Sequence, residues 1–299
     1  AEHGIRDAQE SRGLGDVYKR QNSLKETNKM SKKIFYLSSE VDPFSNTYSL
    51  SEFSQKVCSR LHNIEDFDIR LNQPKYGYIS ERKYILREVI RLRDMLIEFN
   101  SGVDSVNLKS AFIPNSRVQI YFTESEKHFK PLIELLYKSK NGRYYKDNDL
   151  KFSFFCKVAL ETIKRLFWQP DIIVCNDWQM SMLPILLKKI YKNDEYYKNI
   201  KTVFFLHNID ENRVYSSESH KYVGLDEASS EIDNLEQAIL HSDYLVIVDD
   251  EKKNLSKQFK KHKNLFNAHK KTKTMYLTVP EKSKWSDVSK KIETLLRKI

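Results

Sequence analysis

Three polar pairs at the ends of apolar or helical stretches carry side chains suited to chemistry. Asn176-Asp177 follows PDIIVC, His207-Asn208 follows KTVFFL, and Asp147-Asn148 opens a helical pattern. Carboxylates and carboxamides bind hydroxyl groups, and histidine can also carry a proton. Each pair has a structural alternative, because Asp commonly caps a following helix and a strand-end histidine is often only hydrogen-bonded.

A second candidate is the glycine pair in RGLGDV at 12–17, where Gly13 and Gly15 would let the backbone approach a bound group closely. A working glycine loop follows a buried strand and opens a helix, but the preceding AEHGIRDAQES contains no apolar run. We therefore expect residues 1–29 to be a disordered or non-native leader, with Met30 as the start. A displaced functional loop is the alternative.

Composition limits the class of protein. The chain has 299 residues, of which 40% are hydrophobic and 31% charged, as is typical of soluble globular proteins. No apolar stretch approaches the roughly 20 residues that span a bilayer, and we expect a cytoplasmic protein without a membrane partner. Cys58, Cys156 and Cys175 lie far apart, which predicts buried thiols. We expect no metal and no cofactor.

The formal net charge of +10 has two interpretations, an anionic partner or a solvated lysine-rich surface. The densest run, at 251–273, carries nine lysines. Leu255, Phe259 and Phe266 keep an apolar face within it, which favours a pair of surface helices. Because no zinc-finger or RNA-binding aromatic motif accompanies the lysines, we do not expect nucleic-acid binding.

Short apolar runs alternate with helical patterns along the chain. The runs predict strands within 32–41, 67–77, 170–177, 201–208, 243–250 and 273–280, with two more in 107–125 around a turn at Pro114-Asn115. The helical patterns cover 50–63, 126–138, 148–167 (opening on an Asn148 cap), 178–192, 231–242, the lysine-rich run and 283–299.

This alternation predicts βαβ crossovers and an α/β fold with a doubly wound, mostly parallel, Rossmann-like sheet. We expect residues 30–299 to form one domain. Such sheets bind ligands beyond the carboxyl ends of their strands. The segments to examine are therefore 42–49, 75–80, 176–179, 207–212 and 249–251.

Five segments occur in the order found in a known family: KIFYLSSEVDPFSNTYSLSEF (33–53), RLNQPKYGYI (70–79), YYKDNDLKFSFFCKVALE (144–161), PDIIVCNDWQMSMLPILLKKIY (170–191) and TVFFLHN (202–208). Together they resemble the N-terminal domain of bacterial glycogen and starch synthases. The resemblance covers roughly 32–250 and is closest to the short, single-domain members. It implies one half of the two-domain GT-B glycosyltransferase fold.

The resemblance implies a set of site residues. The catalytic candidates are Asp147, Asn176 and His207, and the substrate-binding candidates are Asn46, Thr47, Tyr48, Asn148, Asp177, Trp178, Gln179 and Asn208. The family's K-T-G-G-L-G-D loop aligns with 46–52, where Asn46 replaces the lysine and Tyr48, Ser49 and Ser51 replace the glycines. Asn176 stands where the family carries histidine and cannot carry a proton.

Full-length family members transfer glucose from ADP-glucose to an α-1,4-glucan, and a second domain holds much of the nucleotide. That domain would need roughly a hundred or more residues, whereas about fifty follow Asp250. We therefore expect binding of α-glucan and ADP-glucose with weak or no transfer by this chain alone. One alternative is an active enzyme whose cleft a partner chain completes. Another is a non-catalytic docking or regulatory subunit with an apolar patch around Tyr48, Tyr78 and Tyr215.

Overall fold

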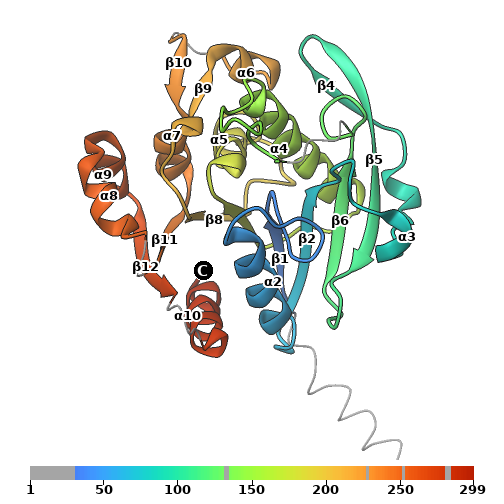
Figure 1. Ribbon diagram of the computed structural model, residues 1–299, viewed down its shortest axis with the longest axis horizontal. Helices are drawn as coiled ribbons and strands as arrows, with labels where there is room; N and C mark the ends of the chain where they lie inside the picture. The colour runs from blue at the N-terminus through green and yellow to red at the C-terminus, as the bar shows by residue number, and fades with distance from the viewer. Residues whose placement is uncertain (1–30, 131–134, 227–228, 251–252, 280–283) are drawn as a thin grey trace, which may run out of the picture.

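A ten-stranded sheet runs through the computed structural model (Figure 1), which describes residues 31–130, 135–226, 229–250, 253–279 and 284–299. The strand order is β12-β11-β8-β7-β1-β2-β6-β5-β3, with β4 paired to β5. The path from β12 to β6 is parallel throughout, and β5, β3 and β4 add antiparallel pairings at one end. The leader predicted at 1–29 lies outside the described residues.

The strands are β1 (Lys32–Leu37), β2 (Phe67–Pro74), β3 (Arg87–Glu88), β4 (Met95–Phe99), β5 (Gly102–Phe112), β6 (Gln119–Glu124), β7 (Ile172–Asn176), β8 (Lys201–Leu206), β9 (Val214–Ser216), β10 (Glu231–Asp233), β11 (Tyr244–Asp250) and β12 (Lys273–Val279). The α-helices are α2 (Leu50–Leu61), α3 (Glu81–Tyr84), α4 (Asn148–Arg165), α5 (Met182–Lys189), α6 (Ser217–Tyr222), α7 (Asn234–His241), α8 (Leu255–Lys261), α9 (Lys263–His269) and α10 (Trp285–Lys298). Short 3-10 turns lie at Ile90–Leu92, Trp178–Met180 and Glu211–Arg213.

The central strands are apolar on both faces because helices cover both sides of a parallel sheet. Ile34, Phe35 and Leu37 of β1 are fully buried, as is every residue of β7. Each large apolar side chain of this kind contributes about 1.5–3 kcal/mol when removed from water. α2 buries one stripe, which includes Phe53, against this core.

The direction of winding reverses at β1. From β1 the chain crosses by α2 to β2 on one side, whereas β7, β8, β11 and β12 follow in order on the other side. Right-handed crossovers then place α2 and the connecting helices on opposite faces. α10 packs beside α2, while α4, α5, α7 and α9 pack in series. The adjacent carboxyl ends of β1 and β7 therefore form the switch point of the sheet.

Some local predictions were wrong. The helix expected over 126–138 is absent from its described parts, where 126–129 form turns and 135–138 form bends and an isolated bridge. The β4–β5 hairpin was missed, although its strand Met95–Phe99 alternates buried and exposed residues. Asn148 is not the cap of α4, because Asp147 occupies the cap position. The Asp147 side chain makes no capping hydrogen bond.

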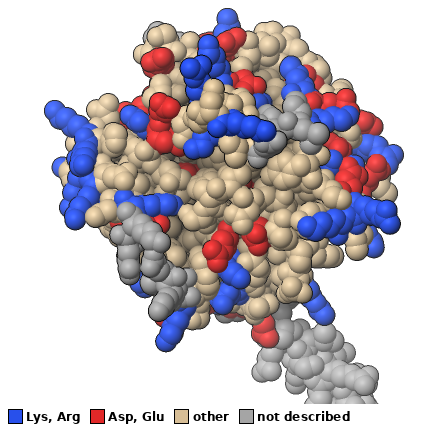
Figure 2. Space-filling view, viewed as in Figure 1, with Lys and Arg blue, Asp and Glu red and all other residues tan. Residues whose placement is uncertain are grey.

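The lysine-rich segment forms the predicted pair of surface helices. α8 and α9 bury Leu255, Phe259, Leu265 and Ala268, and their lysines face outward. Figure 2 shows these lysines at the left margin of a face whose centre is mostly uncharged. Among the helices of the described ranges, none is long and apolar enough to cross a membrane.

Candidate functional site

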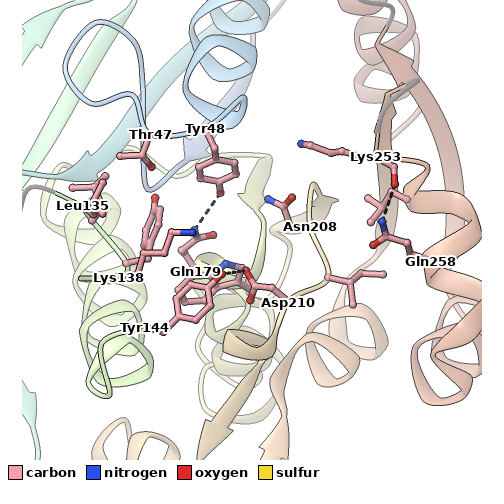
Figure 3. A pocket seen from close by; sticks show the side chains of 15 residues that line it. Thr47, Tyr48, Leu135, Lys138, Tyr144, Gln179, Asn208, Asp210, Lys253 and Gln258 are labelled. Carbon is pink, nitrogen blue, oxygen red and sulfur yellow. Dashed lines mark hydrogen bonds between the residues drawn. The ribbon is translucent and has the colours of Figure 1, made fainter. Parts of the chain in front are cut away.

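A pocket of about 350 Å³ lies at the switch point, beyond the carboxyl ends of β1, β7, β8 and β11 (Figure 3). Its walls come from segments far apart in the sequence. The lining residues are Thr47, Tyr48, Leu135, Leu136, Tyr137, Lys138, Tyr144, Trp178, Gln179, Asn208, Ile209, Asp210, Lys253, Leu255 and Gln258. We call this space the strand-end pocket.

Asp177 organises the inner end of the strand-end pocket. One carboxylate oxygen accepts the backbone N–H groups of His207 (3.2 Å) and Asn208 (3.0 Å). The other accepts the Asn208 side-chain amide (3.0 Å) and the Tyr48 phenol (3.1 Å). The carboxylate therefore joins the loop after β7 to the loops after β8 and β1.

The backbone of Asp177 is strained. Its φ of 61° and ψ of −175° lie in a region that favours glycine and that costs other residues about 1–3 kcal/mol. The Asp177 N–H donates to the Phe205 carbonyl at 2.7 Å, and the carboxylate bonds fix the other side. This geometry directs the Asp177 carboxylate toward the β8 loop. Its side chain makes no capping bond, so helix capping, the structural alternative considered from the sequence, is not its role.

Burial raises the pKa of Asp177 to about 6, and the nearby Asp210 carboxylate adds to the rise. Hydrogen bonds from Asn208 and His207 oppose this shift. Burial also raises the pKa of Asp210, whose Oδ2 accepts a hydrogen bond from the Tyr144 phenol at 3.4 Å. Two carboxyl groups with raised pKa values therefore lie close together, with Asp210 in the lining of the strand-end pocket and Asp177 behind it.

The loop after β1 is fixed by a buried carboxylate, Glu40. Its Oε1 accepts the Thr47 hydroxyl at 2.6 Å and the Tyr137 phenol at 2.7 Å, and its Oε2 accepts the Thr47 backbone N–H. Burial raises the pKa of Glu40. Thr47 and Tyr48 are thereby held at the wall of the strand-end pocket, and Figure 3 shows Tyr48 pointing into it toward Gln179.

Asn176 and His207 lie beneath this wall in the core. The Asn176 Oδ1 is bonded to the Tyr36 phenol (3.1 Å) and His207 Nε2 (3.2 Å), and its amide donates to the Leu37 carbonyl at 2.8 Å. The His207 ring packs edge-on against Phe53 and is 2% exposed. Burial lowers the pKa of His207 well below its ordinary value, and Lys253 lowers it further. The imidazole is therefore neutral at neutral pH.

The structure thus brings together only part of the set predicted from the sequence. Thr47, Tyr48, Trp178, Gln179 and Asn208 line the strand-end pocket, with Asp177 directly behind Tyr48.

The remaining candidates lie elsewhere. Asn46 bonds to Asp42 and Ser51. Asp147 is exposed and pairs with Lys151 at 3.0 Å. Asn148 is buried and donates to the Tyr137 carbonyl at 2.8 Å and to Asn212 at 3.1 Å.

Several lining residues were missed from the sequence: Lys138, Tyr144, Asp210, Lys253 and Gln258. Asp210 lies in the segment 207–212 that the strand-end rule marked but was not named as a candidate, and Lys253 lies just beyond the marked segment 249–251. Lys138 and Tyr144 lie between elements, and an isolated bridge between them brings them to the wall. The apolar surface patch predicted around Tyr48, Tyr78 and Tyr215 does not include Tyr215. This side chain is fully buried, and its phenol donates to the Trp178 carbonyl. No group of metal-binding side chains occurs within the described ranges.

Comparison with known proteins identifies the family of this chain. The model of the starch synthase catalytic domain matches residues 33–265, which includes the strand-end pocket. The chain belongs to this family. The resemblance to glycogen and starch synthases drawn from the sequence is therefore confirmed.

Relatives of the starch synthase family align over most of this chain. It is 36% identical to the glycogen synthase of Pelodictyon phaeoclathratiforme over 220 residues, which are 71% of this chain and 45% of the relative. It is 40% identical to the glycogen synthase of Chlorobium luteolum over 184 residues, 59% of this chain and 36% of the relative. The chain thus spans less than half the length of these relatives.

A solved structure of the same family has the same fold. The catalytic domain of starch synthase IV from Arabidopsis thaliana, bound to ADP and acarbose, superposes with a TM-score of 0.67 at 18% identity, over 82% of this chain and 51% of that one. The predicted α/β fold of the GT-B type, with a mostly parallel sheet, is confirmed.

Proposed function

We propose that this chain binds an α-1,4-glucan in the strand-end pocket and, by itself, transfers glucose from ADP-glucose weakly or not at all. One observation carries the binding proposal: the carboxamide of Asn208 lines the same space as the aromatic side chains of Tyr144 and Trp178. Carboxamides both donate to and accept from sugar hydroxyls. Aromatic rings suit the apolar faces of a sugar, and specific pockets combine the two kinds of contact.

The chemistry available at the strand-end pocket supports weak transfer. Departure of a diphosphate leaving group needs fixed positive charge in a closed site. The lining set supplies Lys138 and Lys253, and Lys253 already donates to Ser49 at 2.8 Å. His207 lies behind the wall and is neutral. The structural neighbour was solved with ADP and acarbose, so we propose a nucleotide sugar and an oligosaccharide as the ligands to test.

Binding and transfer are measured separately. Electrophoresis in gels containing glycogen, with calorimetry on maltohexaose, should reveal binding, while radiolabelled ADP-glucose with glycogen primer should give little or no incorporation. Asn208→Ala should weaken maltohexaose binding about three- to tenfold through one lost hydrogen bond.

Asn199→Ala is the matched control. Exposed Asn199 precedes β8, whereas Asn208 follows the same strand. Equal effects of pocket and control variants would contradict the glucan site. Rapid glucose incorporation by the purified chain would contradict the weak-transfer proposal.

A second candidate function is docking on another chain that supplies a second lobe, and one feature favours it. A groove of about 510 Å³ beside the strand-end pocket is lined by Phe44, Tyr78, Lys83 and Tyr84 among others, and Thr47 lines both spaces. Tyr78 is 41% exposed there. If docking is the function, the chain should form a complex with a full-length glycogen synthase, and Tyr78→Ala should weaken that complex.

A further inference from the structure

Three consecutive residues, Thr47, Tyr48 and Ser49, cross the switch point, and we call them the pocket strap. Each side chain is anchored to a different part of the fold. Thr47 bonds to Glu40 after β1, Tyr48 bonds to Asp177 after β7, and Ser49 accepts a hydrogen bond from Lys253 before α8. The pocket strap is therefore held at both ends with Tyr48 between them.

The Tyr48 phenol both donates and accepts a hydrogen bond inside the protein. It donates to Asp177 Oδ2 at 3.1 Å and accepts from the Gln179 side-chain amide at 3.2 Å. Its ring packs edge-on against Tyr137, with the centroids 6.0 Å apart. Tyr48 is thus packed in place as well as hydrogen-bonded.

Asp177 and Gln179 are consequently covered by the protein itself. Both Asp177 oxygens are occupied by donors from the chain, with Tyr48 on the side toward the strand-end pocket. A hydroxyl that donates to a carboxylate and accepts from a carboxamide makes the same pair of bonds that a sugar hydroxyl makes in a binding site. The Tyr48 phenol therefore makes both bonds of a bound hydroxyl group at Asp177 and Gln179.

We propose that Tyr48 is a resident plug that occupies a hydroxyl-binding subsite formed by Asp177 and Gln179, and so limits a bound glucan to the outer part of the strand-end pocket. This inference rests on the proposed glucan binding for its ligand, but the covering of Asp177 can be tested without one. Removing the ring should open the subsite, whereas removing only the phenol oxygen should leave it filled.

The test compares Tyr48→Ala, Tyr48→Phe and the control Tyr276→Ala, which removes a half-exposed tyrosine from β12. Calorimetry with maltohexaose should show about three- to tenfold tighter binding for Tyr48→Ala, the gain expected from one recovered hydrogen bond. Tyr48→Phe and Tyr276→Ala should bind as the unaltered chain does. Unchanged or weaker binding by a folded Tyr48→Ala would overturn the proposal.

A second measurement uses a water-soluble carbodiimide with glycinamide, which labels accessible carboxyl groups, followed by peptide mass mapping. The Asp177 peptide should be labelled in Tyr48→Ala and protected in the other three proteins. If none of the four proteins binds maltohexaose, the proposed glucan binding fails. The labelling of Asp177 then decides by itself whether Tyr48 covers this carboxylate. Equal labelling of Asp177 in all four proteins would overturn it. If Tyr48→Ala does not melt cooperatively, Lys253→Ala replaces it, since loss of the bond to Ser49 should raise Asp177 labelling in the same direction.

Discussion

The phenol oxygen of Tyr48 lies 3.1 Å from Oδ2 of Asp177, although the two residues are 129 positions apart in the chain. This contact joins the loop after β1 to the loop after β7 at the point where the winding of the sheet reverses. Parallel sheets bind ligands at such points. Here the chain's own side chain meets the buried carboxylate, and four predictions follow from the surroundings of this pair.

The protonation of Asp177 should make stability depend on pH. Its pKa is about 6 in the folded protein against an ordinary value of 3.8, so the folded state binds the proton more tightly. The stabilisation is complete below about pH 4 and is lost as the pH rises through 6. Relative to Asp177→Asn, the free energy of unfolding of the unaltered chain should be about 2 kcal/mol larger at pH 4.5 than at pH 7.5. Urea titrations of both proteins at each pH measure this change. If the unaltered chain and Asp177→Asn differ in stability by the same amount at pH 4.5 and pH 7.5, the raised pKa of Asp177 is refuted.

The strained backbone of Asp177 gives a second prediction. Asp177→Gly and Asp177→Ala both remove the carboxylate, but only glycine adopts a φ of 61° and ψ of −175° without strain. The glycine variant should therefore be the more stable of the two by roughly 1 kcal/mol. At exposed Lys291 in α10 the order should reverse, because glycine is about 1 kcal/mol worse than alanine inside a helix. Thermal or urea unfolding of the four variants gives the comparison, which fails if alanine is also preferred at 177.

Glu40 should be important for stability. Glu40→Gln replaces one acceptor oxygen with a donor that faces the Thr47 or Tyr137 donors. The expected loss is about 1–3 kcal/mol in the free energy of unfolding. Glu52→Gln, at an exposed position in the first turn of α2, should change stability by less than about 0.5 kcal/mol. Similar effects of the two substitutions would show that Glu40 does not anchor the loop.

His207 should not titrate near neutral pH. Its ring is buried, its Nε2 bonds to Asn176 Oδ1 at 3.2 Å, and its pKa lies well below the ordinary value. In nitrogen-detected NMR spectra its ring signals should stay fixed between about pH 6 and pH 8, the range in which an ordinary histidine loses its proton. Asn176→Ala removes the bonded oxygen and helps to assign the signal. A titrating His207 ring would instead support the acid–base role considered from the sequence.

Much of the fold could be predicted from the sequence. Apolar runs such as IIVC at 172–175 form buried strands because parallel strands are covered on both faces. Since the carboxyl ends of parallel strands share one edge, the segments after β1, β7 and β8 were expected to meet, and Tyr48, Gln179 and Asn208 do line one pocket. The β4–β5 hairpin was missed because its short alternating strand lies in a charged stretch.

The tertiary structure alone decided which of these side chains face the strand-end pocket. His207 and Asn176 end their strands as predicted but point into the core, and Asp147 points to solvent beside Lys151. Lys253 reaches Ser49 from 204 residues away. The sequence alone determined the elements and their common edge, since periodicity and propensity are local. Strand order, the side-chain direction at each strand end and the contact between Tyr48 and Asp177 depend on packing between distant segments, which local pattern does not specify.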